Sequence, residues 1–225
     1  LTCQYKVMSA AKKLDKLKSI LSESGSAVIA LSGGTDSTLL VSVAAGIPGQ
    51  RVMAVTVVTP YMFSSEVDEA ALFCREKGVP HRQVRFDIPA AVRTNPPDRC
   101  YLCKTEVMKA ITAVAGEEGY AFVFDGTNAD DLLEYRPGLK ALAEAGVRSP
   151  LAEARLTKEE IRALARAASL SVSDRPSNTC LLTRFPHDTR INPEELFRAE
   201  RAERIVKQAG FTGARVRVHG EILRL

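Results

Sequence analysis

The stretch AVIALSGGTDSTLLVSVAA, residues 27–45, decides the fold of this chain. It opens with an apolar run typical of a buried strand and continues, from about residue 36, with a helical composition. Gly33 and Gly34 stand between the two, where an open parallel sheet binds ligands. Glycines allow close backbone approach, and the free N–H groups at a helix start favour an anion. The turn therefore predicts an anion site, and its hydroxyl donors would be Ser32, Ser37 and Thr38.

Further apolar runs alternate with helical patterns along the first half of the chain. Runs of this length without polar alternation are typical of strands buried on both faces of a parallel sheet. We therefore predict a doubly wound α/β fold. The expected strands lie at 27–31, 52–58, 82–86 and 121–125, and the expected helices at 9–23, 36–45, 64–77 and 102–116.

The second half of the chain changes character. Two strong helix patterns, at 156–170 and 192–210, are separated by connectors rich in proline and serine, and Thr157 with Glu160 fits a capping box at the start of the first. Residues 214–223 alternate apolar and basic side chains, as in a single strand with one solvated face. We expect a sheet domain over residues 1–150 and a smaller C-terminal α+β part over residues 151–225.

Composition sets the outer limits on function. The chain has 225 residues, 45% hydrophobic content and a net charge of +4, a mild excess that suits an anionic small molecule and is too weak for a nucleic-acid footprint. Its apolar stretches are far shorter than the ~20 residues needed to span a bilayer, and its first residues lack a signal-peptide core. We expect a cytoplasmic protein that binds neither membrane nor nucleic acid.

Five cysteines are an odd number in a chain long enough to fold without disulfides, so reduced thiols that bind metal or do chemistry are expected. Cys100 and Cys103 form a C-x-x-C pair, and Cys180 lies in the loop PSNTCLLTR, whereas Cys3 and Cys74 belong to a terminal tail and a helix pattern. A structural zinc site needs four ligands, and a fourth candidate is not obvious in this sequence. Three cysteines suit a 4Fe-4S cluster with one open iron, although two buried thiols on a helix would give the same C-x-x-C spacing.

The turn itself resembles a known phosphate-binding motif. SGGTDS at 32–37 fits neither the Walker A spacing nor the Rossmann fingerprint. It resembles the PP-loop, S-G-G-x-D-S, of the adenine nucleotide alpha-hydrolase-like enzymes. The resemblance implies that the turn holds the β and γ phosphates of ATP as a pyrophosphate leaving group, that Asp36 is available for Mg2+ or for ordering the loop, and that AMP is transferred to a substrate.

Further motifs resemble one family within that superfamily. Together with SGGTDSTLL they are similar to the LarE family of ATP-dependent sulfur transferases, which make the nickel-pincer nucleotide cofactor. The resemblance implies that ATP adenylylates a carboxylate of pyridinium-3,5-biscarboxylic acid mononucleotide and that sulfur then gives a thiocarboxylate. The motifs are NPPDRCYLCK (95–104), DGTNADDLLEYRPG (125–138), GVRSPL (146–151), RPSNTCLLTRFP (175–186) and VRVHG (216–220).

The cysteines acquire roles from this resemblance. Some LarE-like enzymes carry a 4Fe-4S cluster on three cysteines, at positions that match Cys100, Cys103 and Cys180 here. Others have only the last of the three and sacrifice its sulfur, which leaves dehydroalanine. The complete set favours the cluster, with Cys180 as the catalytic alternative.

Roles for further residues follow from the residue patterns and from the same resemblance. Arg215 and Arg217 alternate along the predicted last strand, so both guanidinium groups can bind one phosphate. The alternative is that they only form a solvent-exposed face of that strand. The resemblance places the substrate's phosphate there. It also places Arg184 and Arg136 near the reacting phosphates, where surface salt bridges are the alternative. Glu203 is a candidate acid/base or metal neighbour, or an exposed helix carboxylate. The expected nucleotide contacts after the strand at 121–125 are Gly126, Thr127 and Asn128, unless they form only a turn.

Rival functions share parts of this pattern. A PP-loop tRNA thiolation enzyme with a three-cysteine cluster is the nearest, but it needs an RNA-binding surface that the charge pattern does not predict. An amidating synthetase needs no set of three cysteines, and a nucleotide-binding regulatory module would leave them idle. The favoured hypothesis is a homo-oligomeric enzyme that acts on a small-molecule nucleotide.

Overall fold

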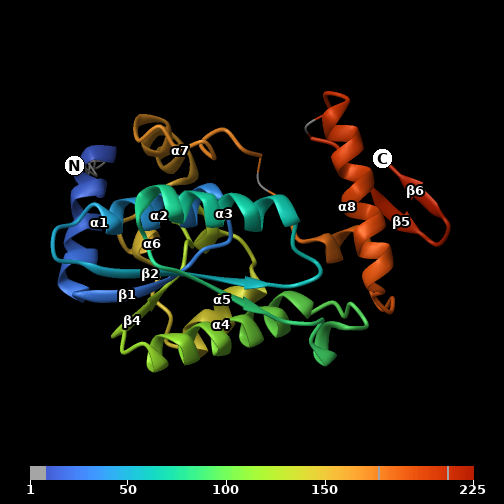
Figure 1. The fold of residues 1–225 in the computed structure, drawn as a ribbon, viewed down its shortest axis with the longest axis horizontal. Helices are drawn as coiled ribbons and strands as arrows, with labels where there is room; N and C mark the ends of the chain where they lie inside the picture. The colour runs from blue at the N-terminus through green and yellow to red at the C-terminus, as the bar shows by residue number, and fades with distance from the viewer. Residues whose placement is uncertain (1–8, 177, 212) are drawn as a thin grey trace, which may run out of the picture.

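The computed structural model describes residues 9–176, 178–211 and 213–225; Cys3 lies outside these ranges. Its centre is a four-stranded sheet in the order β3-β2-β1-β4, and every neighbouring pair of strands is parallel (Figure 1). The predicted strands are confirmed, and no end differs from its predicted position by more than one residue. The strands are β1 (Ser26–Ala30), β2 (Arg51–Val58), β3 (His81–Arg85) and β4 (Phe122–Phe124).

Both faces of the sheet are buried. Successive residues of a strand point to opposite faces, and accordingly Ile29 of β1 packs into one core cluster while its neighbour Val28 packs into another. The first cluster includes side chains from five helices: α1 (Ala10–Ser24), α2 (Thr35–Ala45), α3 (Ser64–Lys77), α6 (Pro150–Glu153) and α7 (Lys158–Ala167). The second is closed by α4 (Arg99–Glu117) and α5 (Pro137–Glu144), which lie below the sheet in Figure 1. The fold is therefore doubly wound, as predicted.

A further core lies beyond the sheet. It joins buried side chains from the 3-10 helices η1 (Ala90–Val92) and η3 (Leu181–Arg184), from α8 (Pro193–Gln208) and from β5 (Arg217–His219). The short helix η2 (Asp130–Leu133) follows β4. In Figure 1, α8 stands at one end of the molecule, and β5 and β6 lie on its outer side. The domain boundary near residue 150 stays a prediction. Helix α7 follows that boundary in the chain and packs against α2 of the sheet domain.

The end of the chain differs from the prediction of one strand over 214–223, which was wrong. β5 turns back into β6 (Ile222–Arg224), and the two pair as an antiparallel hairpin. The turn contains Gly220 with φ 59°, a left-handed conformation that ends the strand and suits glycine. None of the helices in the described ranges is both long and apolar enough to cross a membrane.

Candidate functional site

A cavity of about 840 Å3 opens at the carboxyl ends of the central strands. The chain passes from β1 to β2 on one side of β1, and β4 is added on its other side, so the strand order reverses between β1 and β4. Loops that leave the two strands diverge at such a point and form the binding crevice of open α/β sheets. The glycine turn after β1 and residues 125–131 after β4 both line this cavity.

The glycine turn is shaped for an anion. Gly33 has φ +80°, and a Cβ there would lie 2.6 Å from the carbonyl oxygen of Glu66, so only glycine fits. Gly34 is the N-cap of α2 and makes no side-chain cap, which leaves the first N–H groups of the helix to a ligand. The Ser32 N–H donates to Ser37 Oγ at 3.2 Å, and Ser37 Oγ donates to the Gly34 carbonyl at 3.3 Å. These bonds hold the turn in place.

Asp36 meets a lysine that the sequence analysis did not select. Lys158, the first residue of α7, donates from Nζ to Asp36 Oδ2 at 2.6 Å, and both residues line the cavity. Asp36 Oδ1 is buried and has no hydrogen-bond partner among the described residues. A carboxylate oxygen without a partner at a phosphate site is a suitable ligand for Mg2+. The capping box of Thr157 and Glu160, predicted from the sequence, is confirmed and begins the helix that presents Lys158.

The loop after β4 lies directly on the glycine turn. A Cβ on Gly126 would approach Ser37 N to 2.9 Å, so the close contact of the two loops requires glycine here as well. The Thr127 hydroxyl donates to the buried Asp125 carboxylate at 2.6 Å, and Asn128 Oδ1 accepts from the Asp131 N–H at 3.2 Å. All three residues predicted as nucleotide contacts, Gly126, Thr127 and Asn128, line the cavity.

Cys103 and Cys180 line the same cavity. The Tyr61 hydroxyl lies 3.1 Å from Cys103 Sγ, and the Tyr61 carbonyl accepts from the Leu181 N–H at 2.9 Å, next to Cys180. Tyr61 thus contacts both cysteine segments, one through its side chain and one through its backbone.

Burial governs the acidity of these thiols. The pKa of Cys180 is raised to about 11, chiefly by burial and in part by negative charge on Cys103 and Cys100. Burial also raises the pKa of Cys103, while the bond from Tyr61 opposes that rise. Cys100 is exposed at the start of α4. No three His, Cys, Asp or Glu side chains of the described part of the chain are arranged as a ready metal site. Charge on Cys100 and Cys103 therefore affects the pKa of Cys180, but the three thiols are not arranged as a complete metal site.

Arg184 and Glu203 pair with each other outside the lining of the cavity. Arg184 is 2% exposed, and its Nε donates to Glu203 Oε1 at 2.6 Å. The predicted roles of Arg184 at the phosphates and of Glu203 as acid or base stay predictions.

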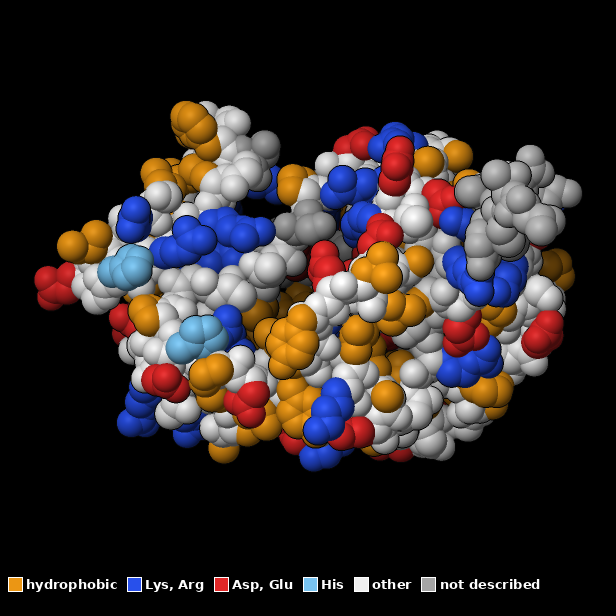
Figure 2. Space-filling view, turned by 180° about the vertical axis from the view of Figure 1, so that it is seen from behind, with side chains coloured by type: hydrophobic (Ala, Val, Ile, Leu, Met, Phe, Trp, Pro, Cys, Tyr) orange, Lys and Arg blue, Asp and Glu red, His pale blue; other side chains and the backbone are white. Residues whose placement is uncertain are grey.

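The remaining predicted arginines lie nearer to solvent. Arg136 lines the rim of the cavity and forms a 2.8 Å ion pair with Asp131. Arg215 and Arg217 are exposed on either side of the buried Val216, and Arg217 begins β5. Figure 2 shows basic side chains gathered on the C-terminal part of the molecule beside a hollow. The exposed basic residues of α8 and the hairpin region are Arg198, Arg201, Arg204, Lys207, Arg215, Arg217 and Arg224.

Sequence reasoning missed several residues of the site. Arg175 donates to the Gly33 carbonyl at 3.1 Å and pairs with Glu69 of α3, so it braces the glycine turn. Glu66 lines the cavity and accepts from Asn178 at 3.1 Å, and burial raises its pKa. No local pattern marks these residues, because their partners lie far away in the sequence.

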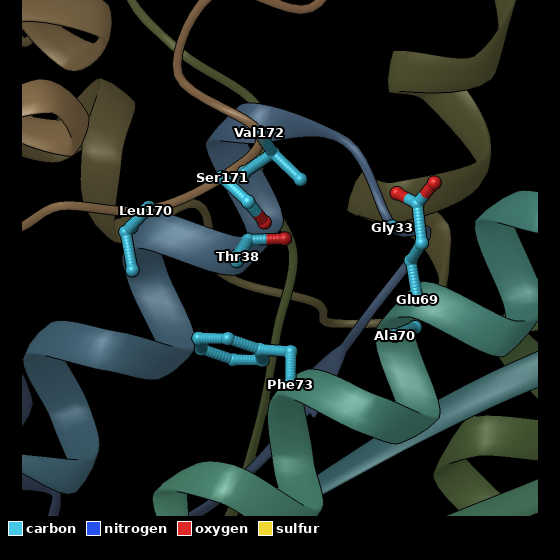
Figure 3. Close-up of a pocket in the computed structure, with 8 residues that line it drawn as sticks. All are labelled: Gly33, Thr38, Glu69, Ala70, Phe73, Leu170, Ser171 and Val172. Carbon is cyan, nitrogen blue, oxygen red and sulfur yellow. The ribbon is translucent and has the colours of Figure 1, made fainter.

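A second, much smaller pocket of about 20 Å3 lies behind the glycine turn (Figure 3). It is bordered by Gly33 of the turn, by Thr38 of α2, by Glu69 and Phe73 of α3, and by Val172. That volume suits about one water molecule. The large cavity is therefore the candidate ligand site, and the small pocket belongs to the packing that supports the turn.

Comparisons with known proteins were made against this geometry. A family model described as asparagine synthase matches residues 17–134. An uncharacterised protein of Synechocystis is 38% identical over 215 residues, which cover 95% of this chain and 80% of that protein. The pyridinium-3,5-bisthiocarboxylic acid mononucleotide synthase of Lactiplantibacillus plantarum is 32% identical over 218 residues, which cover 96% of this chain and 79% of that one.

Among solved structures, the U34-tRNA thiolase NcsA of Methanococcus maripaludis with its 4Fe-4S cluster has a TM-score of 0.55 to this chain. The match covers 89% of this chain and 74% of that one at 20% identity. At that identity the likeness concerns the fold alone.

Proposed function

Because this chain belongs to the LarE family of PP-loop ATP-dependent sulfur transferases, we propose that it makes a thiocarboxylate for the nickel-pincer nucleotide cofactor. Its substrate would be pyridinium-3,5-biscarboxylic acid mononucleotide. The observation that supports this best is that residues of the PP-loop and the two cysteines Cys103 and Cys180 line one and the same cavity. A carboxylate activated at the PP-loop can therefore react with sulfur held by the cysteines without leaving the protein.

In the first step, a substrate carboxylate oxygen attacks the α-phosphorus of ATP. The bond from that phosphorus to the bridging oxygen breaks, pyrophosphate leaves, and an acyl adenylate forms. The N–H groups at the start of α2 would bind the departing phosphates, since they have no side-chain cap. Asp36 would hold Mg2+ through its unpartnered oxygen, and Lys158 would turn from Asp36 to the phosphates.

In the second step, sulfur displaces AMP from the acyl carbon. We propose that Cys100, Cys103 and Cys180 hold a 4Fe-4S cluster, because their donor set consists of three free thiols that influence one another's charge. When bound, the cluster would supply a sulfide on its open iron. Burial raises the pKa of the Cys180 thiol to about 11, so a bound metal would have to take the place of its proton.

The second candidate is sacrifice of Cys180 itself. Its thiolate attacks the acyl carbon, AMP leaves, and a thioester forms. Removal of the Cα proton then breaks the Cβ–S bond, which releases the thiocarboxylate and leaves dehydroalanine. The position of Cys180 in the cavity lining supports this route as well.

Arg215 and Arg217 would bind the phosphate of the mononucleotide, since both are exposed and only the buried Val216 separates them in the chain. We further propose a cytoplasmic homo-oligomer that acts on this small molecule and not on RNA. Light scattering of the purified protein would give the oligomeric state.

The decisive experiment measures pyrophosphate release from ATP in the presence of the pyridinium dicarboxylate mononucleotide or of tRNA. Release with the mononucleotide alone supports the proposal, and release with tRNA alone supports the rival thiolation of RNA. Cys180→Ala should keep pyrophosphate release and abolish the thiocarboxylate. Cys74→Ala is the matched control, because Cys74 is buried in α3 and does not line the cavity.

A further inference from the structure

Arg184 is the largest fully buried side chain in the described part of the protein. A guanidinium group has five N–H donors. Those of Arg184 are directed at Glu203, Thr179, Thr183 and Asn178, with distances from 2.6 to 3.2 Å. All three of its nitrogens thus have protein partners, which leaves none for a phosphate.

These partners lie on both sides of Cys180 in the chain. Arg184 holds the loop before the cysteine through Asn178 and Thr179, and the short helix after it through Thr183. Residues 178–180 belong to no helix or strand, so side-chain contacts of this kind decide where their backbone lies.

Glu203 connects this loop to the rest of the C-terminal part. Its two oxygens accept from Arg184 Nε at 2.6 Å and Arg184 Nη2 at 3.0 Å, a bidentate arrangement with fixed geometry. Oε1 also accepts from the Val216 N–H at 2.9 Å, between Arg215 and Arg217. One ion pair therefore joins the cysteine loop, α8 and the segment with the two exposed arginines.

We propose that Arg184 and Glu203 are a positioning pair for the sulfur-transfer step. The pair fixes the position of Cys180 relative to the backbone of Arg215 and Arg217. The reacting sulfur therefore stays at a set distance from the place where the substrate's phosphate binds. This inference rests on the proposed function. It assigns neither residue to the ATP phosphates, because the PP-loop is held by other residues, among them Arg175.

The test uses Arg184→Lys and Glu203→Gln. The first keeps the positive charge but loses the planar, bidentate donor group, and the second keeps the shape of the side chain but loses its negative charge. Glu194→Gln is the control, because Glu194 is an exposed carboxylate in the first turn of the same helix. Three quantities are measured on the full chain: pyrophosphate release, thiocarboxylate formation, and the rate at which iodoacetamide alkylates Cys180 in reduced, iron-free protein.

For both variants we expect pyrophosphate release within roughly twofold of the wild type. Thiocarboxylate formation should fall about 100-fold, the loss that a displacement near 1 Å can cause. Alkylation of Cys180 should become faster, since the released loop exposes the thiol. The double variant should lose no more than the worse single variant, because the two residues act as one unit. Retained pyrophosphate release shows that the variants are folded.

Two results would overturn the positioning pair. One is an equal loss of both steps with unchanged alkylation, which would mean direct contact with ATP; the other is no change in any of the three quantities. If the wild-type protein releases no pyrophosphate with the mononucleotide, the proposed function fails, whereas the alkylation rates still test the pair.

Discussion

Gly33 carries the tightest steric constraint of the PP-loop. Its φ is +80°, and an added Cβ would lie 2.6 Å from the Glu66 carbonyl oxygen, closer than real atoms approach. Gly33→Ala must push the turn away from α3, so we expect the Kd for ATP to rise about tenfold or more. The free energy of unfolding should fall by ~1–3 kcal/mol. Calorimetric titration with ATP and urea unfolding measure the two effects.

Gly46→Ala is the matched control for that change. Gly46 ends α2 with φ −81°, and an added Cβ would meet its nearest atom at an ordinary 3.5 Å. We expect ATP affinity close to that of the wild type. If Gly33→Ala binds ATP equally well, the turn is not the phosphate site.

Cys74 makes stability depend on pH in alkaline solution. Burial in α3 raises the pKa of its thiol from 9.0 to about 11. Between these values the unfolded chain loses the proton and the folded protein keeps it, so the free energy of unfolding falls as pH rises. The loss over this window is on the order of 2 kcal/mol.

Urea unfolding of wild type and Cys74→Ala at several pH values isolates this contribution. The difference in unfolding free energy should be flat below pH 8 and should shrink from about pH 9 to pH 11. A difference that stays constant across the whole range would refute the assignment.

At the scale of elements, the start of α7 links stability to the site. Thr157 Oγ1 accepts from the Glu160 N–H at 3.3 Å, and Glu160 Oε2 accepts from the Thr157 N–H at 2.9 Å. Thr157→Ala removes one of these bonds, and we expect the free energy of unfolding to fall by about 1 kcal/mol. Urea unfolding measures this loss.

Thr157→Ser retains the hydroxyl and should unfold like the wild type. ATP affinity is a second readout, because the cap fixes the first turn of α7, from which Lys158 reaches Asp36. Equal stability of the alanine and serine variants would show that the capping box does not anchor this helix.

The elements of the sheet domain could be predicted from the sequence because their signals are local. Apolar runs marked the strands, and the capping box marked α7 within a few residues. The final hairpin was missed, because the alternating pattern of 214–223 continues through the turn at Gly220 and only the left-handed backbone there reveals the reversal.

At the scale of the whole molecule, the sequence predicted two sets of residues but not their meeting in one cavity. The PP-loop and the cysteines were predicted from separate motifs, and the structure shows that both line one cavity, where Tyr61 contacts the two cysteine segments. The pairing of Arg184 with Glu203 and of Lys158 with Asp36 could not be predicted, because each joins helices or loops distant in the chain through side chains with no characteristic spacing.

The cluster route and the sacrificial route predict different numbers of turnovers. A cluster can be refilled with sulfur, whereas Cys180 cannot recover the sulfur that it gives up. After removal of iron by a chelator under reducing conditions, pyrophosphate release should persist, since the PP-loop and Lys158 share no residue with the three cysteines. Thiocarboxylate formation should stop and return after anaerobic reconstitution with iron and sulfide. Repeated turnovers with an unchanged mass of the Cys180 peptide are then expected. Formation that continues without iron, ends after one product per chain and leaves dehydroalanine at position 180 would instead establish the sacrificial route.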